Sequence, residues 1–193
     1  MVAISKKSKT HKPKKPRKIS WEVFQRKYLT REDGYKYEWL DGIVEKTTHA
    51  MNKNQFYIVH NLLNFFYTLK SKGLKGALIP EGDTFFDKHH RRPDLAYYTD
   101  QQILDASNGQ NIVPLFAIEI VSANDQMNYM HKKMQDYRAA EVAVVWHIFP
   151  ELQEVHVYKD KLNKMEILRE KDICNAGTIV KGFKISVKDI FKK

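Results

Sequence analysis

The chain has few of the features that define secreted or membrane proteins. Cys174 is the only cysteine among 193 residues, so an intrachain disulfide is impossible and a cysteine-rich zinc site is excluded. No uninterrupted apolar run approaches the roughly 20 residues that a membrane helix needs. The basic N-terminus is not followed by an apolar segment, so no secretory signal is visible. We therefore expect a soluble, cytoplasmic protein with no membrane partner.

Acidic residues are absent from the N-terminal end. Residues 1–18 hold eight basic side chains and no acid, whereas the remaining 175 residues hold 25 basic and 23 acidic ones. The net charge of +10 therefore belongs mostly to this segment, which also contains Pro13 and Pro16 and few apolar groups. We predict a flexible basic tail over residues 1–18 and a single, nearly neutral domain over residues 19–193.

The basic tail suggests an anionic partner. One interpretation is an arm that binds nucleic-acid phosphates without reading sequence. A nuclear-localisation patch in KPKKPRK and a solubilising extension without a partner are the alternatives. In the first interpretation the binding residues are Lys12, Lys14, Lys15, Arg17 and Lys18.

Hydrophobic periodicity predicts an α/β (α+β) fold in which helices flank a mixed β-sheet. Ser20 is a suitable N-cap for a short helix, and Asp41-Gly42 favours a tight turn in an N-terminal hairpin over residues 35–48. The segment 112–122 is apolar on both faces and should be a central strand. Helices are further predicted over 54–71 and 125–140, and strands over 75–79, 83–87, 94–99 and 142–149. Residues 152–158 and 164–168 should form a hairpin, and a last strand with a helical turn should follow near the C-terminus.

Two carboxylates stand in apolar surroundings. Glu119 lies inside LFAIEIV, and a buried carboxylate requires a cationic partner, either a structural salt bridge or a metal. Asp94 follows Arg92-Pro93 and opens the strand LAYY, although an aspartate that merely ends a loop is the ordinary alternative. On adjacent strands, the two carboxylates, a backbone carbonyl and waters would form a hard-oxygen site for Mg²⁺ or Mn²⁺.

One lysine lies at the edge of an apolar helix face. The helix predicted over 125–140 has an apolar stripe of three methionines and Tyr137. Lys132 lies almost opposite this stripe, whereas Lys133 lies about 80° from its centre. We expect Lys132 to be solvated and Lys133 to place its ammonium near the sheet, although an edge lysine that only reaches back to solvent is the alternative.

Several segments, in this order, resemble the Uma-two family of endonucleases, bacterial members of the PD-(D/E)XK, restriction-endonuclease-like superfamily. They are YKYEWLDGIVEKT, RRPDLAYYT, FAIEIVS and HKKMQDYRAAEVAVVWHIFPELQEVHVY, and the resemblance covers roughly residues 20–160. It implies a restriction-endonuclease-like fold and a metal-dependent endonuclease that hydrolyses nucleic-acid phosphodiester bonds, with DNA as the expected partner. It also implies a homodimer.

The resemblance assigns roles to individual residues. Asp94 matches the aspartate of the PD element, Glu119 the acid of the (D/E)XK element, and Glu38 an additional acid on the hairpin. The usual lysine position is occupied by Val121, but similar family members carry the lysine on the next helix, four residues before a tyrosine, and Lys133 fits that position.

The implied chemistry is metal-assisted hydrolysis. Asp94 and Glu119, with the carbonyl of Ile120, would hold Mg²⁺ or Mn²⁺, and Lys133 would orient the attacking water or stabilise developing charge. The chain departs from the family at Ser122-Ala123-Asn124, where Ser-Pro-Ser is common, and at Tyr129, where an aspartate is common. A catalytically degenerate nuclease fold that acts as a nucleic-acid-binding or assembly module therefore remains the alternative.

Three further expectations concern Glu38 and the histidines. Tyr37 and its aromatic neighbours alternate with Glu38, so Glu38 points away from the core if the aromatic face is buried. We expect His89 and His90 to be loop surface, with contact to a phosphate as the alternative. His147 lies in an apolar strand, and we expect a hydrogen-bonded core or edge histidine.

Overall fold

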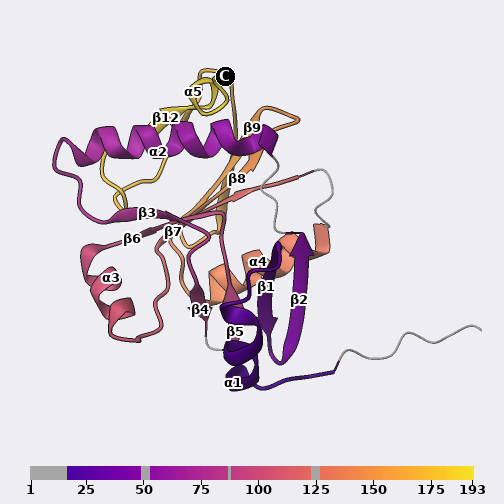
Figure 1. Cartoon of the computed structure of the whole chain (residues 1–193). Coiled ribbons are helices and arrows are strands. Elements are labelled where there is room, and N and C mark those ends of the chain that lie inside the picture. The colour runs from indigo at the N-terminus through magenta and orange to yellow at the C-terminus, as the bar shows by residue number, and fades with distance from the viewer. Residues whose placement is uncertain (1–16, 49–52, 87, 123–126) are drawn as a thin grey trace, which may run out of the picture.

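The chain folds around a six-stranded central sheet (Figure 1). The computed structural model describes residues 17–48, 53–86, 88–122 and 127–193. The strands of this sheet are β3 (Ala77–Pro80), β6 (Leu95–Tyr98), β7 (Phe116–Ile120), β8 (Val144–Phe149), β9 (Glu154–Lys159) and β10 (Lys164–Arg169). Their order is β10-β9-β8-β7-β6-β3, and only β7 and β8 are parallel within it. The predicted mixed α+β architecture is confirmed.

A second sheet holds the N-terminal hairpin. Its order is β2-β1-β5-β4, formed by β1 (Tyr35–Leu40), β2 (Ile43–Thr48), β4 (Thr84–Phe86) and β5 (His89–Arg91). The predicted hairpin turn is confirmed, with positive φ at both Asp41 (44°) and Gly42 (90°), as a two-residue type I′ turn requires. The expectation that His89 and His90 are loop surface is wrong, because both lie in β5 and His90 is buried.

Helices cover both faces of the central sheet, as Figure 1 shows for α2 and α4. In α2, Ile58, Leu62 and Phe66 pack in a cluster with Phe116 and Ile118 of β7. On the other face Met134 and Tyr137 of α4 pack with Ala117. Strand β7 is therefore buried on both faces, as predicted, although it is shorter than the predicted segment. The helices are α1 (Trp21–Phe24), α2 (Phe56–Lys70), α3 (Asp100–Ser107), α4 (Met127–Ala139) and α5 (Val187–Ile190).

The smaller elements lie at the two ends of the chain. Ser20 caps α1 as predicted, since its hydroxyl accepts a hydrogen bond from the Val23 amide, and a π-helical turn over Gln25–Leu29 follows. Near the C-terminus, β11 (Ile173–Asn175) pairs with β12 (Lys184–Ser186), which leads directly into α5. No described helix is long and apolar enough to cross a membrane.

Most of the basic tail lies outside the described residues, including Lys12, Lys14 and Lys15. Its last two residues, Arg17 and Lys18, are exposed. Lys18 forms an ion pair of 2.7 Å with Asp41 in the hairpin turn.

Candidate active site

The two acids that the sequence singled out lie on neighbouring strands. Leu95 of β6 is paired with Ile118 of β7 in antiparallel register, so Asp94, the residue before β6, faces Glu119 one step further along. Asp94 Oδ2 accepts a hydrogen bond of 2.7 Å from the backbone N–H of Ile120. The strand register and this bond therefore fix Asp94 against the end of β7.

Glu119 is buried between β7 and α4. Its Oε2 accepts a hydrogen bond of 2.9 Å from the Lys133 ammonium, and its Oε1 accepts one of 2.5 Å from the Tyr137 hydroxyl. Burial raises the pKa of the Glu119 carboxyl, the Lys133 charge opposes that rise, and the Asp94 charge adds to it. Asp94 and Glu119 are therefore close enough to repel one another.

Lys133 occupies the position that the helical-wheel argument predicted. Its side chain is 8% exposed, whereas the side chain of Lys132 is 60% exposed. Burial works to lower the pKa of Lys133, but the Glu119 and Glu38 carboxylates outweigh it and hold the pKa well above its usual value. Lys133 is therefore a protonated ammonium at neutral pH.

Glu38 reaches the same cluster from β1. Its carboxylate accepts hydrogen bonds from the Arg91 guanidinium (2.8 Å), the Arg92 backbone N–H (2.9 Å) and the Tyr129 hydroxyl (2.5 Å). Burial disfavours its charge, yet Lys133 and Arg91 hold the pKa of Glu38 well below its usual range. Tyr37, which alternates with Glu38 along β1, is buried as well, so both faces of β1 are covered. Glu38 therefore points away from the aromatic face, as expected, but it does not reach solvent.

Arg91 ties the hairpin sheet to helix α4, and the sequence argument missed it. The guanidinium is fully buried, with Nη1 2.8 Å from Glu38 Oε2 and Nη2 2.6 Å from Asp136 Oδ2. His89 Nδ1 lies 2.6 Å from the other Asp136 oxygen. The only sequence signal for Arg91 was its place beside the Pro93-Asp94 pair.

Lys36 is a second lysine of the cluster that the sequence argument missed. It is buried on β1, and its ammonium lies 3.2 Å from Asp94 Oδ1. Each of the two acids therefore has its own ammonium, Lys36 at Asp94 and Lys133 at Glu119.

His147 lies beside this cluster on β8. It is paired in register with Glu119 and is buried, and its Nδ1 has no hydrogen-bond partner within the described chain. The expectation of a hydrogen-bonded histidine is therefore wrong for this nitrogen. Burial lowers the pKa of His147 to about 3, with smaller contributions from Lys133 and His156, so the ring is neutral at pH 7.

The donor atoms at the end of β7 suit a hard divalent cation. Each oxygen of Asp94 and Glu119 accepts one hydrogen bond and keeps a further lone pair. The N–H of Ile120 faces Asp94, so the carbonyl of the same residue faces that side as well. Across the described ranges no three His, Cys, Asp or Glu side chains converge on one point, so an ion here would depend on two acids, a carbonyl and waters.

A mixed sheet with two acids on adjoining strands and a lysine beside them defines the class of restriction-endonuclease-like nucleases. The model of the Uma2 family, described as "Putative restriction endonuclease", matches residues 21–188. The chain belongs to this family.

One solved structure and the curated proteins give two further comparisons. A crystal structure of "a putative nuclease belonging to DUF820" from Anabaena variabilis ATCC 29413 is similar to this chain with a TM-score of 0.72 and 19% identity. The similarity covers 84% of this chain and 93% of the other, and at this identity it shows the fold alone. No curated protein matches the chain.

Proposed function

We propose that this chain is a metal-dependent endonuclease that hydrolyses phosphodiester bonds in DNA. The observation that carries the proposal is the meeting of Asp94, Glu119 and Lys133, which come from three different elements. The lysine comes from α4 and not from the strand that holds the second acid. An ammonium on the following helix can replace one on the strand because it reaches the same carboxylate.

Asp94, Glu119 and the Ile120 carbonyl would hold Mg²⁺ or Mn²⁺ in this proposal. When bound, such an ion supplies neutralisation of phosphate charge and activation of water. Lys133 would donate a hydrogen bond to the attacking water or to the charge that develops on the phosphate. Because its pKa is raised, Lys133 acts as an electrostatic group and not as a base.

Glu38 acts as a positioning residue in this proposal. Its Oε1 lies 3.7 Å from the Lys133 ammonium, and its other contacts are to Arg91, Arg92 and Tyr129. An ionised Glu38 therefore gives the Lys133 ammonium a second carboxylate neighbour besides Glu119. Tyr137 is a positioning residue for Glu119, since its hydroxyl donates a hydrogen bond to Oε1 and so orients the carboxylate.

The proposal is tested by cleavage of supercoiled plasmid DNA in Mg²⁺. Asp94→Asn and Glu119→Gln should each abolish cleavage while circular dichroism reports an unchanged fold. Glu141→Gln, which removes an exposed carboxylate, should cleave like the wild type. Full activity in either site variant would contradict the assignment of these acids.

A degenerate nuclease fold that only binds nucleic acid is the second candidate. The observation in its favour is that Lys36 and Lys133 already offset the charges of Asp94 and Glu119 without an ion. It predicts DNA binding that is the same with and without divalent metal, and no cleavage under any condition. In both candidates the basic tail contributes to binding, so deletion of residues 1–18 should lower DNA affinity and reduce its salt dependence.

A further inference from the structure

The folded part of the chain has a concentration of positive charge of its own. Residues 181–193 carry five lysines and one acid, Asp189, whereas residues 19–180 carry 20 basic and 22 acidic side chains. The excess charge of the domain therefore lies in β12, α5 and the segments beside them. The five lysines, all exposed, are Lys181, Lys184, Lys188, Lys192 and Lys193.

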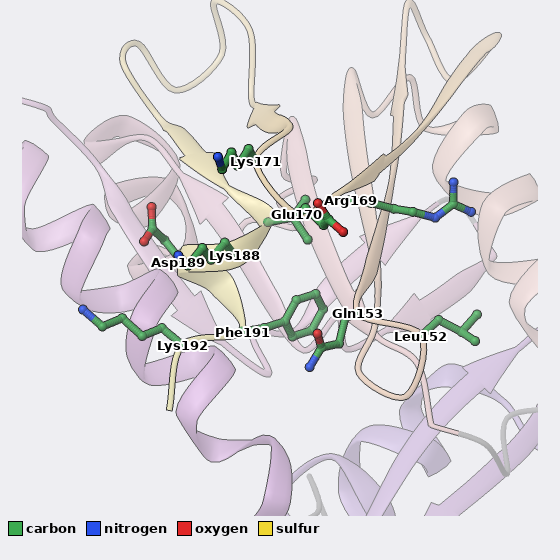
Figure 2. Close-up of a pocket in the computed structure, with 10 residues that line it drawn as sticks. Leu152, Gln153, Arg169, Glu170, Lys171, Lys188, Asp189, Phe191 and Lys192 are labelled. Atoms are coloured by element: carbon green, nitrogen blue, oxygen red, sulfur yellow. The ribbon is translucent and has the colours of Figure 1, made fainter.

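A pocket of about 770 Å³ lies beside this segment (Figure 2). It is bounded by the turn between β8 and β9, the turn between β10 and β11, and helix α5. Figure 2 shows Lys171, Lys188 and Lys192 toward one side of the pocket and Arg169 extending to the other. With Glu170 and Asp189 included, the charged side chains of the lining sum to +2.

The three lysines of this pocket are available to bind an anion. Within the described ranges, Lys171, Lys188 and Lys192 have no carboxylate within ion-pair distance, whereas Arg169 is paired with Glu154 at 2.8 Å. Unpaired ammonium groups are exposed point charges that bind phosphate oxygens without regard to base sequence. We call these three residues the lysine triad.

The strand register places the triad at the same end of the central sheet as the candidate active site. Ile120 at the end of β7 is paired with Ile148 of β8. The next residue of β8, Phe149, is paired with Glu154 of β9, which is in turn paired with Arg169 of β10.

The triad lies on the α2 side of the sheet, since Val187 and Phe191 of the pocket pack in the cluster of α2, whereas Glu119 points to α4 on the other side. A polyanion that reaches both must pass around this end of the sheet.

We propose that the lysine triad is a second phosphate-binding surface, which holds the nucleic-acid backbone at the end of the sheet where the candidate active site also lies. The identity of the polyanion rests on the proposed nuclease function. The surface lies within the described residues and is far in the sequence from the basic N-terminal segment, so the two can be altered separately.

The test is equilibrium binding of the full chain to a 20-base-pair duplex at several salt concentrations, without divalent metal. The variant replaces the triad by Lys171→Gln, Lys188→Gln and Lys192→Gln. The control carries the same charge change at the opposite end of the β9–β10 hairpin, where each lysine is already paired with an acid. Its substitutions are Lys159→Gln, Lys161→Gln and Lys164→Gln.

The triad variant should bind about tenfold or more weakly than the wild type, and its salt slope should fall by about 0.9 for each phosphate that the variant no longer neutralises. The control should bind within about twofold of the wild type, and both variants should melt like the wild type. An unchanged affinity and slope in the triad variant would overturn the inference. The inference would also be overturned if the triad variant lost affinity for anionic phospholipid vesicles but bound DNA like the wild type. The assay needs no cleavage, so the two proposals can fail separately. If the triad variant binds DNA more weakly but the wild-type chain never cleaves DNA, the inference about the triad stands and only the nuclease proposal is refuted.

Discussion

The ammonium of Lys133 in α4 lies 2.9 Å from Oε2 of Glu119 in β7, and both groups are almost fully buried. In the proposed site this pair would take the place of the acid and lysine that a PD-(D/E)XK strand usually carries two residues apart, since Val121 occupies the usual lysine position here. A lysine on α4 can reach Glu119 because α4 packs on the face of β7 to which Glu119 points. An ammonium is therefore supplied to the same carboxylate from a different element.

Lys133→Ala should reduce Mg²⁺-dependent cleavage far more than Lys132→Ala. Removal of Lys133 eliminates a buried charge-assisted donor, whereas Lys132 is mostly solvated and 3.8 Å from Glu45. We expect a loss of about 100-fold or more in the first variant, which is the size of effect typical of one donor that stabilises a transition state. Initial rates of plasmid nicking measure both variants, and equal effects would refute the role of Lys133.

Arg91→Met should destabilise the fold by about 3–5 kcal/mol, because it leaves Glu38 and Asp136 as buried charges without their main partner. Urea unfolding monitored by tryptophan fluorescence measures the loss. Arg26→Met, at an exposed position of the first helical segment, is the matched control and should change stability by less than about 0.5 kcal/mol. A fully stable Arg91→Met variant would mean that the two carboxylates find other partners.

The stability of the protein should depend on pH through His147. The folded-state pKa of about 3 lies below the ordinary value of 6.5, so between these values the unfolded chain binds a proton that the folded chain does not. This contribution is present above pH 6.5, and it is lost as the pH falls toward 3, by at most about 1.4 kcal/mol for each pH unit.

His147→Phe should therefore flatten the dependence of the unfolding free energy on pH between about 6.5 and 4. His131→Gln, which removes an exposed histidine of α4, should leave that dependence as in the wild type. Identical pH profiles for wild type and His147→Phe would show that His147 is not held neutral by the fold.

Lys36→Met should increase the affinity for Mn²⁺. The Lys36 ammonium is hydrogen-bonded to Oδ1 of Asp94 and offsets its charge, so it weakens the attraction of Asp94 for a cation. A hydrogen bond to a charged group contributes roughly 1.5–3 kcal/mol, so its removal should tighten Mn²⁺ binding by about tenfold or more. Calorimetry measures this, with Lys132→Met as the control. Weaker Mn²⁺ binding in Lys36→Met would show that Lys36 supports the ion site.

The elements with strong periodicity were predictable from the sequence. Strand β7, helix α4 and the hairpin turn at Asp41-Gly42 each carry a local signal that their packing reinforces. Helix α3 was not predicted because it buries none of its residues and so has no apolar stripe, although Thr99 and Gln102 form a capping box at its start. Strand β5 is three residues long and polar, which hides it from any periodicity argument.

The cluster around Asp94, Glu119 and Lys133 was predictable only in part. Glu119 is conspicuous because it interrupts an apolar strand, and Lys133 because it lies at the edge of an apolar helix face. Lys36 and Arg91 were not predictable, because their burial depends on partners 58 and 53 residues away in the chain. A charged side chain in a polar stretch gives no local sign that it will be paired over such a distance.

Calorimetric titration with Mn²⁺ tests most directly whether Asp94 and Glu119 hold one divalent ion. The wild type should bind Mn²⁺, and Asp94→Asn and Glu119→Gln should each weaken binding by about tenfold or more, since even outer partners of metal ligands contribute about 10–100-fold. Glu141→Gln should bind as the wild type does. Mn²⁺ binding that persists in both site variants, or a wild-type chain that binds no Mn²⁺, would contradict the account.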